Sequence, residues 1–158
     1  MENKYEKIKM ANVVPYSFAQ ELLKGSHDFI NATIKIALYT AGSGTPYSVS
    51  NTVYTSGTAN QVSGTGYTTN GNTLNNPVVA NQTNVATLTF DQTQWTSATF
   101  GAAYGVIYND TDGDKLVVVL DFGGTKSCSN GTFTITFPST SSSGPGAAGT
   151  NSLISISS

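Results

Sequence analysis

The stretch AAYGVIYNDTDGDKLVVVLDFGGTKSCSNGTFTITF, residues 102–137, decides the fold class of this 158-residue chain. It predicts three strands joined by two turns: strands at 104–108, 115–122 and 132–137, and turns at 109–114 and 123–131. The dipeptides DG at 112–113 and NG at 130–131 adopt the positive φ angles of tight turns at little cost. The middle strand carries the apolar run LVVVL at 116–120. Because neighbouring side chains of a strand point to opposite faces, both faces of this run need a cover: a helix, a second sheet or another chain.

The segment PYSFAQELLKG near the N-terminus predicts one short helix. It matches a capping box, in which the Ser17 hydroxyl accepts from the amide of Gln20 and the Gln20 side chain reaches back. Gly25 is placed to end the helix. Phe18 and Leu22 are four residues apart, so they share one apolar face. We expect this face to pack on the sheet and to cover one side of the LVVVL run.

Other stretches predict more strands. Residues 32–40, ATIKIALYT, alternate between apolar and other side chains, which indicates a strand with one buried face. Residues 77–80 and 84–91 read as a hairpin. Between these elements, residues 41–76 are rich in Gly, Ser, Thr and Asn and predict edge strands on a long surface excursion.

These patterns together predict a mainly β fold, an antiparallel β-sandwich or jelly-roll-like body with one short N-terminal helix. The expected organisation is a flexible leader at 1–10, the β body at 11–138, a Ser/Gly-rich linker at 139–150 and a C-terminal strand or arm at 151–158. The last strand, LISI, needs a sheet edge to pair with, either in its own chain or in a neighbouring one.

Composition excludes several classes of function. Charged residues make up 10% of the chain, and all seven basic residues are lysine. A nucleic-acid partner is not expected, because such surfaces cluster Lys and Arg against phosphates. No apolar run approaches the length of a membrane span, so a membrane partner is not expected either. Cys128 is the single cysteine, which excludes an internal disulfide. Low charge with abundant small hydroxyl residues is typical of extracellular or virion β-proteins.

The residues that could carry chemistry are few. Asp110, Asp112 and Asp114 form either a solvated turn or a weak cation site, although no Glu follows where a calcium loop would place one. The single histidine, His27, and Cys128 have no partner placed by sequence to form a nucleophile pair, so both read as structural. No motif for a cofactor or for catalysis is present, and we expect neither a cofactor nor an enzyme.

Aromatic residues allow two interpretations. They could form an exposed stacking surface for sugar or protein, or they could be cross-strand packing partners. The residues concerned are Tyr39, Tyr47, Tyr54, Tyr67, Tyr104, Tyr108 and Trp95. Trp95 and Phe100 are expected to flank a short polar connection that closes one end of the sheet.

Six blocks of the sequence resemble, in this order, a family of small tailed-bacteriophage proteins. They are FAQELLKGSHDF, IKIALYT, YTTNGNTL, WTSATFGAAYGVIYND, LVVVLDFGG and GTFTITFP, and the closing LISIS is similar to the end of that family. The resemblance covers roughly residues 11–156 and contains no catalytic signature. It implies a virion structural protein, made in the host cytoplasm, whose role is head decoration (cement) or, as an alternative, a tail or fibre component.

A decoration protein implies two partners, the major capsid protein and further copies of itself, with a trimer as the general expectation for such proteins. The second face of the LVVVL run is then a candidate oligomer interface, the 41–76 excursion a candidate capsid contact, and the C-terminal strand a candidate for pairing with a neighbour. The candidate interface residues are Leu116, Val118, Leu120, Tyr47, Tyr54, Tyr67, Leu153, Ile154 and Ile156. The alternative function from a different class is a carbohydrate-binding or host-adhesion module of a tail or head fibre.

Overall fold

The computed structural model describes residues 13–42, 44–82, 85–138 and 153–157. Within these ranges the chain forms one helix and seven strands. They are α1 (Tyr16–Leu23), β1 (Ile34–Tyr39), β2 (Asn72–Thr73), β3 (Val78–Gln82), β4 (Val85–Thr89), β5 (Thr93–Asn109), β6 (Lys115–Ile135) and β7 (Ile154–Ser157). The strands form two antiparallel sheets, ordered β2-β1-β5-β6 and β3-β4-β7. The predicted fold class, mainly β with one short N-terminal helix, is confirmed.

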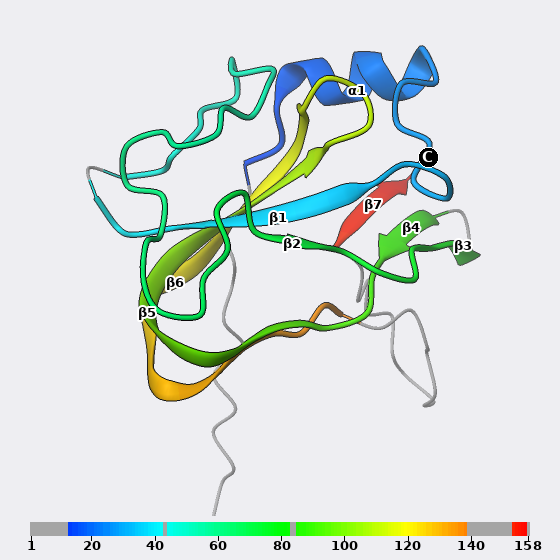
Figure 1. Cartoon of the computed structure of the whole chain (residues 1–158). Coiled ribbons are helices and arrows are strands. Elements are labelled where there is room, and N and C mark those ends of the chain that lie inside the picture. Colours follow the sequence, from blue (N-terminus) through cyan, green and yellow to red (C-terminus); the bar gives the residue numbers. More distant parts are fainter. Residues whose placement is uncertain (1–12, 43, 83–84, 139–152, 158) are drawn as a thin grey trace, which may run out of the picture.

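The two sheets share one apolar core. Figure 1 shows β5 and β6 curving together along one side of the molecule, with β3, β4 and β7 on the opposite side and α1 across the top. Buried side chains from all of these layers belong to one cluster: Phe18 of α1, Ile36 and Leu38 of β1, Leu88 of β4, and Ile107 and Leu120 of the long strands. Burial of this shared cluster is the main term that holds the sheets together.

The long β5–β6 hairpin is the backbone of the fold and differs from the predicted meander. Residues 126–128 and 131, predicted as part of a turn, pair with β5, so β6 is one bent strand instead of two strands and a turn. The bend falls where Gly123 and Gly124 adopt φ of +69° and +113°. Such angles cost glycine little, and they let the strand fold over on itself.

Two further predictions near β5 and β6 have opposite outcomes. The predicted turn after residue 109 is confirmed, with positive φ at Gly113 and Asp114. The prediction that a polar connection separates Trp95 from Phe100 is wrong, because both residues lie within β5. Register shifts beside Ala98 let β5 continue through this polar stretch, and a local sequence pattern cannot distinguish such a bulge from a turn.

The predicted helix is confirmed, but the predicted capping box of Ser17 and Gln20 does not form. Pro15 is the N-cap residue and α1 begins at Tyr16, so Ser17 lies inside the first turn and makes no capping hydrogen bond. Proline at the helix start fixes φ near the helical value and needs no donor there, which explains the earlier start. Gly25, with φ of +73°, follows the last turn as expected.

The predicted strand at 32–40 and the hairpin at 77–91 correspond to β1 and to β3–β4. Strand β1 is buried on both faces, however, not on one, since Ala37 and Tyr39 are as enclosed as Ile36. The C-terminal strand β7 pairs antiparallel with β4 of the same chain. The predicted leader at 1–10 and linker at 139–150 lie outside the described residues.

Candidate functional site

A cleft opens between the two limbs of the bent strand β6. It has a volume of about 360 Å³ and is lined by residues before the bend (Leu120 and Phe122), just after it (Lys126, Ser127 and Cys128) and farther along the second limb (residues 132–138), together with Leu153. A volume of this size is at the lower end of the range of small-molecule and side-chain pockets, roughly 300–1,000 Å³.

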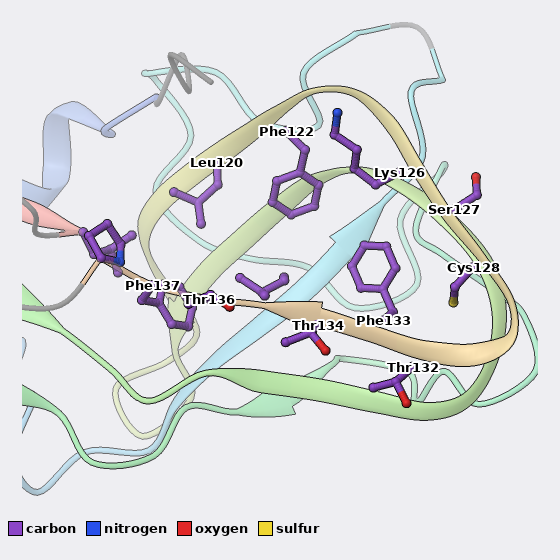
Figure 2. A pocket seen from close by; sticks show the side chains of 13 residues that line it. Leu120, Phe122, Lys126, Ser127, Cys128, Thr132, Phe133, Thr134, Thr136 and Phe137 are labelled. Atoms are coloured by element: carbon purple, nitrogen blue, oxygen red, sulfur yellow. The ribbon is translucent and has the colours of Figure 1, made fainter. Parts of the chain in front are cut away.

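The limbs present apolar side chains to the cleft. Figure 2 shows Phe122 and Phe133 projecting toward each other from the two limbs, while Thr132 and Thr134 point to the other side of β6. The Phe122 ring reaches across β5 above Gly105, where an added Cβ would lie 3.1 Å from the end of the ring. Phe133 packs on Phe100, with ring centroids 5.1 Å apart, and against the edge of Trp95. The walls of the cleft are therefore held in place by the core.

The cleft offers contacts that suit an apolar group. Its described lining residues include one cation, Lys126, one thiol, Cys128, and several hydroxyls, but neither a carboxylate nor an imidazole. An aliphatic or aromatic side chain that entered the cleft would contact the phenylalanine rings.

Sequence reasoning missed this cleft, although a signal was present. The alternation FTITF places Phe133, Ile135 and Phe137 on one face of the strand, and LDF before the bend does the same for Leu120 and Phe122. Only the bend at Gly123 and Gly124 brings these two faces opposite each other.

The second face of the LVVVL run is covered by the chain itself, not by another chain. Leu116 and Val119 lie on this face, whereas Val118 and Leu120 belong to the main core, and all four are at most 2% exposed. Tyr47 and Tyr54 pack over Leu116 and Val119, and Val13 pairs with Val119 at the end of this face. This burial corrects the expectation that Leu116, Val118 and Leu120 form an oligomer interface, because a partner chain could not reach them. The same holds for Tyr47 and Tyr54 as capsid contacts.

The 41–76 excursion therefore acts as a cover instead of projecting outward. Isolated bridges join it to the strands, pairing Tyr39 with Gln61, Val53 with Lys115, and Thr65 with Thr99. The Tyr67 hydroxyl accepts a hydrogen bond from the Leu38 amide at 2.9 Å, which anchors the excursion to β1. Local sequence gave no sign of this because the anchoring contacts are tens of residues apart in the chain.

The tyrosine hydroxyls of this cover form a satisfied network. Tyr54 and Tyr108 stack with ring centroids 4.0 Å apart. The Tyr108 hydroxyl donates to the Asn70 carbonyl at 2.9 Å, and the Tyr54 hydroxyl donates to the Asn70 side chain at 3.0 Å. Burial raises the pKa of Tyr54 to about 12 and also raises the pKa of Tyr39 and Tyr108 above the ordinary value. These phenols therefore stay neutral and structural.

An exposed aromatic surface is not formed by the residues considered for it. Tyr39, Tyr47, Tyr54, Tyr108 and Trp95 are buried, and Tyr67 and Tyr104 are half-buried. The structure therefore supports the interpretation that these seven side chains are packing partners within the fold.

The three aspartates of the β5–β6 turn do not converge. Asp110 pairs with Lys35 at 2.9 Å and Asp112 with Lys115 at 2.6 Å. The pKa of Asp114 is raised, mainly by partial burial of its carboxyl group and to a lesser extent by the nearby negative charge of Asp110. In the described part of the chain, no three acidic, His or Cys side chains are grouped as metal ligands would be. The segment has the geometry of a turn.

His27 and Cys128 make structural contacts. The His27 ring packs against Phe18 and Phe29, and its Nε2 is 3.0 Å from the Glu21 carboxylate, so it ties the end of α1 to the core. The Cys128 thiol donates to the Ala98 carbonyl at 3.3 Å, across the β5–β6 ladder.

The C-terminal candidates lie on the chain's own body. Leu153 is buried in the main core and its amide donates to the Leu88 carbonyl at 2.9 Å. Ile154 is half-buried against the same core. The backbone of Ile156 pairs with Ala86 in β4.

The described helix, α1, is too short to cross a membrane. Comparison of the chain with protein-family models, with curated proteins and with solved structures found no match.

Proposed function

We propose that this chain is a non-enzymatic structural protein of a bacteriophage particle, and specifically a capsid decoration protein that stabilises the head by bridging capsid subunits. The observation that carries the proposal is the apolar cleft between the limbs of β6, whose described lining presents the rings of Phe122 and Phe133 as binding contacts. The resemblance of the sequence blocks to small tailed-phage proteins gives the cleft its context.

The cleft fits this role through its chemistry. An apolar side chain from a capsid subunit, inserted between Phe122 and Phe133, would bury surface at about 25 cal/mol per Å². A single such contact is weak. A particle presents many equivalent sites at high local concentration, however, so weak contacts add up to stable coating. We propose the major capsid protein and further copies of this chain as its partners, and the virion as its location.

A carbohydrate-binding role has little to support it, since the aromatic residues that motivated it are buried or half-buried in the described structure. Stacking on sugars requires exposed rings.

The direct test is co-sedimentation of the purified protein with heads that lack it. We expect saturable binding and a higher temperature of head rupture. Phe122→Ala, which empties one wall of the cleft, should weaken binding. Tyr16→Ala, which removes an exposed ring on α1, is the matched control and should bind normally. Absence of binding to heads would refute the decoration role, and binding to tails alone would move the protein to the tail.

A further inference from the structure

Strand β3 is an exposed edge of the smaller sheet. It is the outer strand in the order β3-β4-β7 and lies at the outer margin of the molecule in Figure 1. Val78 and Val79 point to opposite faces of the strand, yet they are 44% and 56% exposed. An edge that shows apolar side chains on both faces is a template for pairing with another strand.

The edge lacks the usual protection against such pairing. Natural edge strands carry charges, most often lysine, or are interrupted by proline or a bulge. Strands β3, β4 and β7 contain no charged residue, and β3 pairs with β4 in unbroken register. By contrast, the outer strand β6 of the larger sheet carries Lys115, Asp121 and Lys126.

The direction of the backbone groups in β3 follows from its neighbours. The Leu88 carbonyl accepts from the Leu153 amide, so the backbone groups of Leu88 face away from β3. Val79 lies opposite Leu88, which makes this a pair without mutual hydrogen bonds. The amide and carbonyl of Val79 therefore point outward, and those of Asn81, two residues on, do the same.

We propose that β3 pairs antiparallel with β3 of a second copy, about a two-fold axis at Ala80. In this register Val79 of each copy lies opposite Asn81 of the other, and each of the two pairs exchanges two backbone hydrogen bonds. The three-stranded sheets become one continuous sheet across the axis. The alternative register centred on Val79 would place Asn81 opposite Pro77, which has no amide hydrogen to donate, so it forms fewer bonds.

A second copy is the occupant that the charges favour. The edge offers nothing to a charged segment, whereas two copies meet with neutral, apolar and amide side chains only. Such an interface is isologous and closes at two chains. Dimerisation through β3 does not depend on the virion role, so either proposal can fail without the other.

The first measurement is the mass of the full chain by light scattering after gel filtration. We expect a species of about 33 kDa, twice the 16.5 kDa of one chain, that dissociates on dilution. At about 100 μM, even a dimer held by a binding free energy of about 5 kcal/mol would be partly populated. A chain that is still monomeric at that concentration overturns the proposal. A trimer or an open-ended series of larger species overturns it as well.

Two variants test the edge itself. Asn81→Pro removes an outward amide hydrogen and leaves the β3–β4 hydrogen bonds in place, and Val79→Lys places like charges near each other across the axis. Each should raise the dimer dissociation constant at least about tenfold while circular dichroism and the melting curve show a folded monomer. Leu23→Lys is the matched control, because Leu23 is 92% exposed on α1, and it should dimerise normally. Equal dimerisation of all three variants would place the interface elsewhere.

Cross-linking tests the register. Residues that face each other without hydrogen bonds have Cα atoms about 4.5 Å apart, within the range that a disulfide spans. In a Cys128→Ser background, Ala80→Cys should therefore form a covalent dimer under mild oxidation. Ala59→Cys, at an exposed alanine in the 41–76 excursion, should not. Covalent dimers of both variants in equal yield, or of neither, would contradict pairing about Ala80.

Discussion

The two halves of the β5–β6 hairpin use the same pair of strands but are buried in different ways. In the proximal half, β5 residues 104–109 pair with β6 residues 115–121, and almost every side chain is enclosed. In the distal half, β5 residues 93–102 pair with β6 residues 126–135, and exposed residues alternate with buried ones. Both halves are antiparallel ladders, and the distal one is interrupted by register shifts beside Ala98. What differs is the cover. Tyr47 and Tyr54 of the 41–76 excursion pack over the second face of the proximal half, whereas the excursion meets the distal half through the Thr65–Thr99 bridge and the Tyr67 ring.

Because of this difference, one half of the hairpin is rigidly packed and the other is accessible to a binding partner. A strand buried on both faces is stabilised by packing and offers nothing to a partner. The distal half keeps one covered face and opens the cleft beside Phe122 and Phe133. The molecule thus combines an enclosed half with a half that can bind.

The largest backbone effect should come from breaking the cover of the proximal half at Gly71. An added Cβ there would lie 1.8 Å from the Ile36 carbonyl oxygen, and φ is +77°. We expect Gly71→Ala to lower the free energy of unfolding by about 3 kcal/mol or more, through overpacking and backbone strain together. Urea unfolding followed by circular dichroism measures it.

Gly57→Ala is the control for Gly71→Ala. Gly57 has a similar φ of +67°, but an added Cβ meets nothing within 4 Å. It should cost only about 1–2 kcal/mol of backbone strain. Equal losses in the two variants would show that the excursion is not pressed against β1.

A matched pair of isoleucines compares the two halves directly. Ile107 is fully buried in the proximal half, whereas Ile135 lines the cleft in the distal half. Ile107→Ala should cost about 3–5 kcal/mol, since the enclosed site cannot collapse around the cavity. Ile135→Ala should cost about 2 kcal/mol or less, because the cleft already admits solvent. The same urea titration measures both, and a larger loss at Ile135 would contradict the comparison.

High pH should weaken the proximal half through its tyrosines. Burial raises the pKa of Tyr54 from 10.0 to about 12, so the unfolded chain loses this proton before the folded one does. The stabilisation is present below pH 10 and is lost as pH rises through 10 toward 12. Unfolding free energies measured between pH 8 and 11 should fall above pH 10.

Tyr54→Phe is the control for the alkaline effect, because it removes the titrating group while keeping most of the ring packing. The variant should show a shallower fall in stability above pH 10. A wild-type stability that does not change over this range would refute the assignment of neutral, buried phenols to this cover.

The smallest expected effect is the loss of one hydroxyl. Tyr108→Phe leaves the Asn70 carbonyl without the donor that lies 2.9 Å away, at a cost of about 1 kcal/mol. Tyr16→Phe, at a ring that is 76% exposed, should change stability by no more than about 0.5 kcal/mol. Thermal melting distinguishes the two, and identical melting temperatures would mean that the hydrogen bond contributes nothing.

Local patterns in the sequence determined the class of the fold and several of its elements. Period-two alternation identified β1 and the β3–β4 hairpin, and Gly25 marked the end of the helix. These features depend on neighbouring residues, so a local reading finds them. The apolar run at 116–120 also established that its strand needed two covers.

Only the tertiary structure decided what those covers are and where the candidate site lies. Tyr47 and Tyr54 cover Leu116 from about 60 residues away in the chain, and the bend at Gly123 and Gly124 sets Phe133 opposite Phe122. A glycine pair inside a polar stretch is equally compatible with a turn or with a bent strand. Pairing with the far end of β5 selects the bent strand, and that pairing is a long-range interaction that no local stretch of sequence contains.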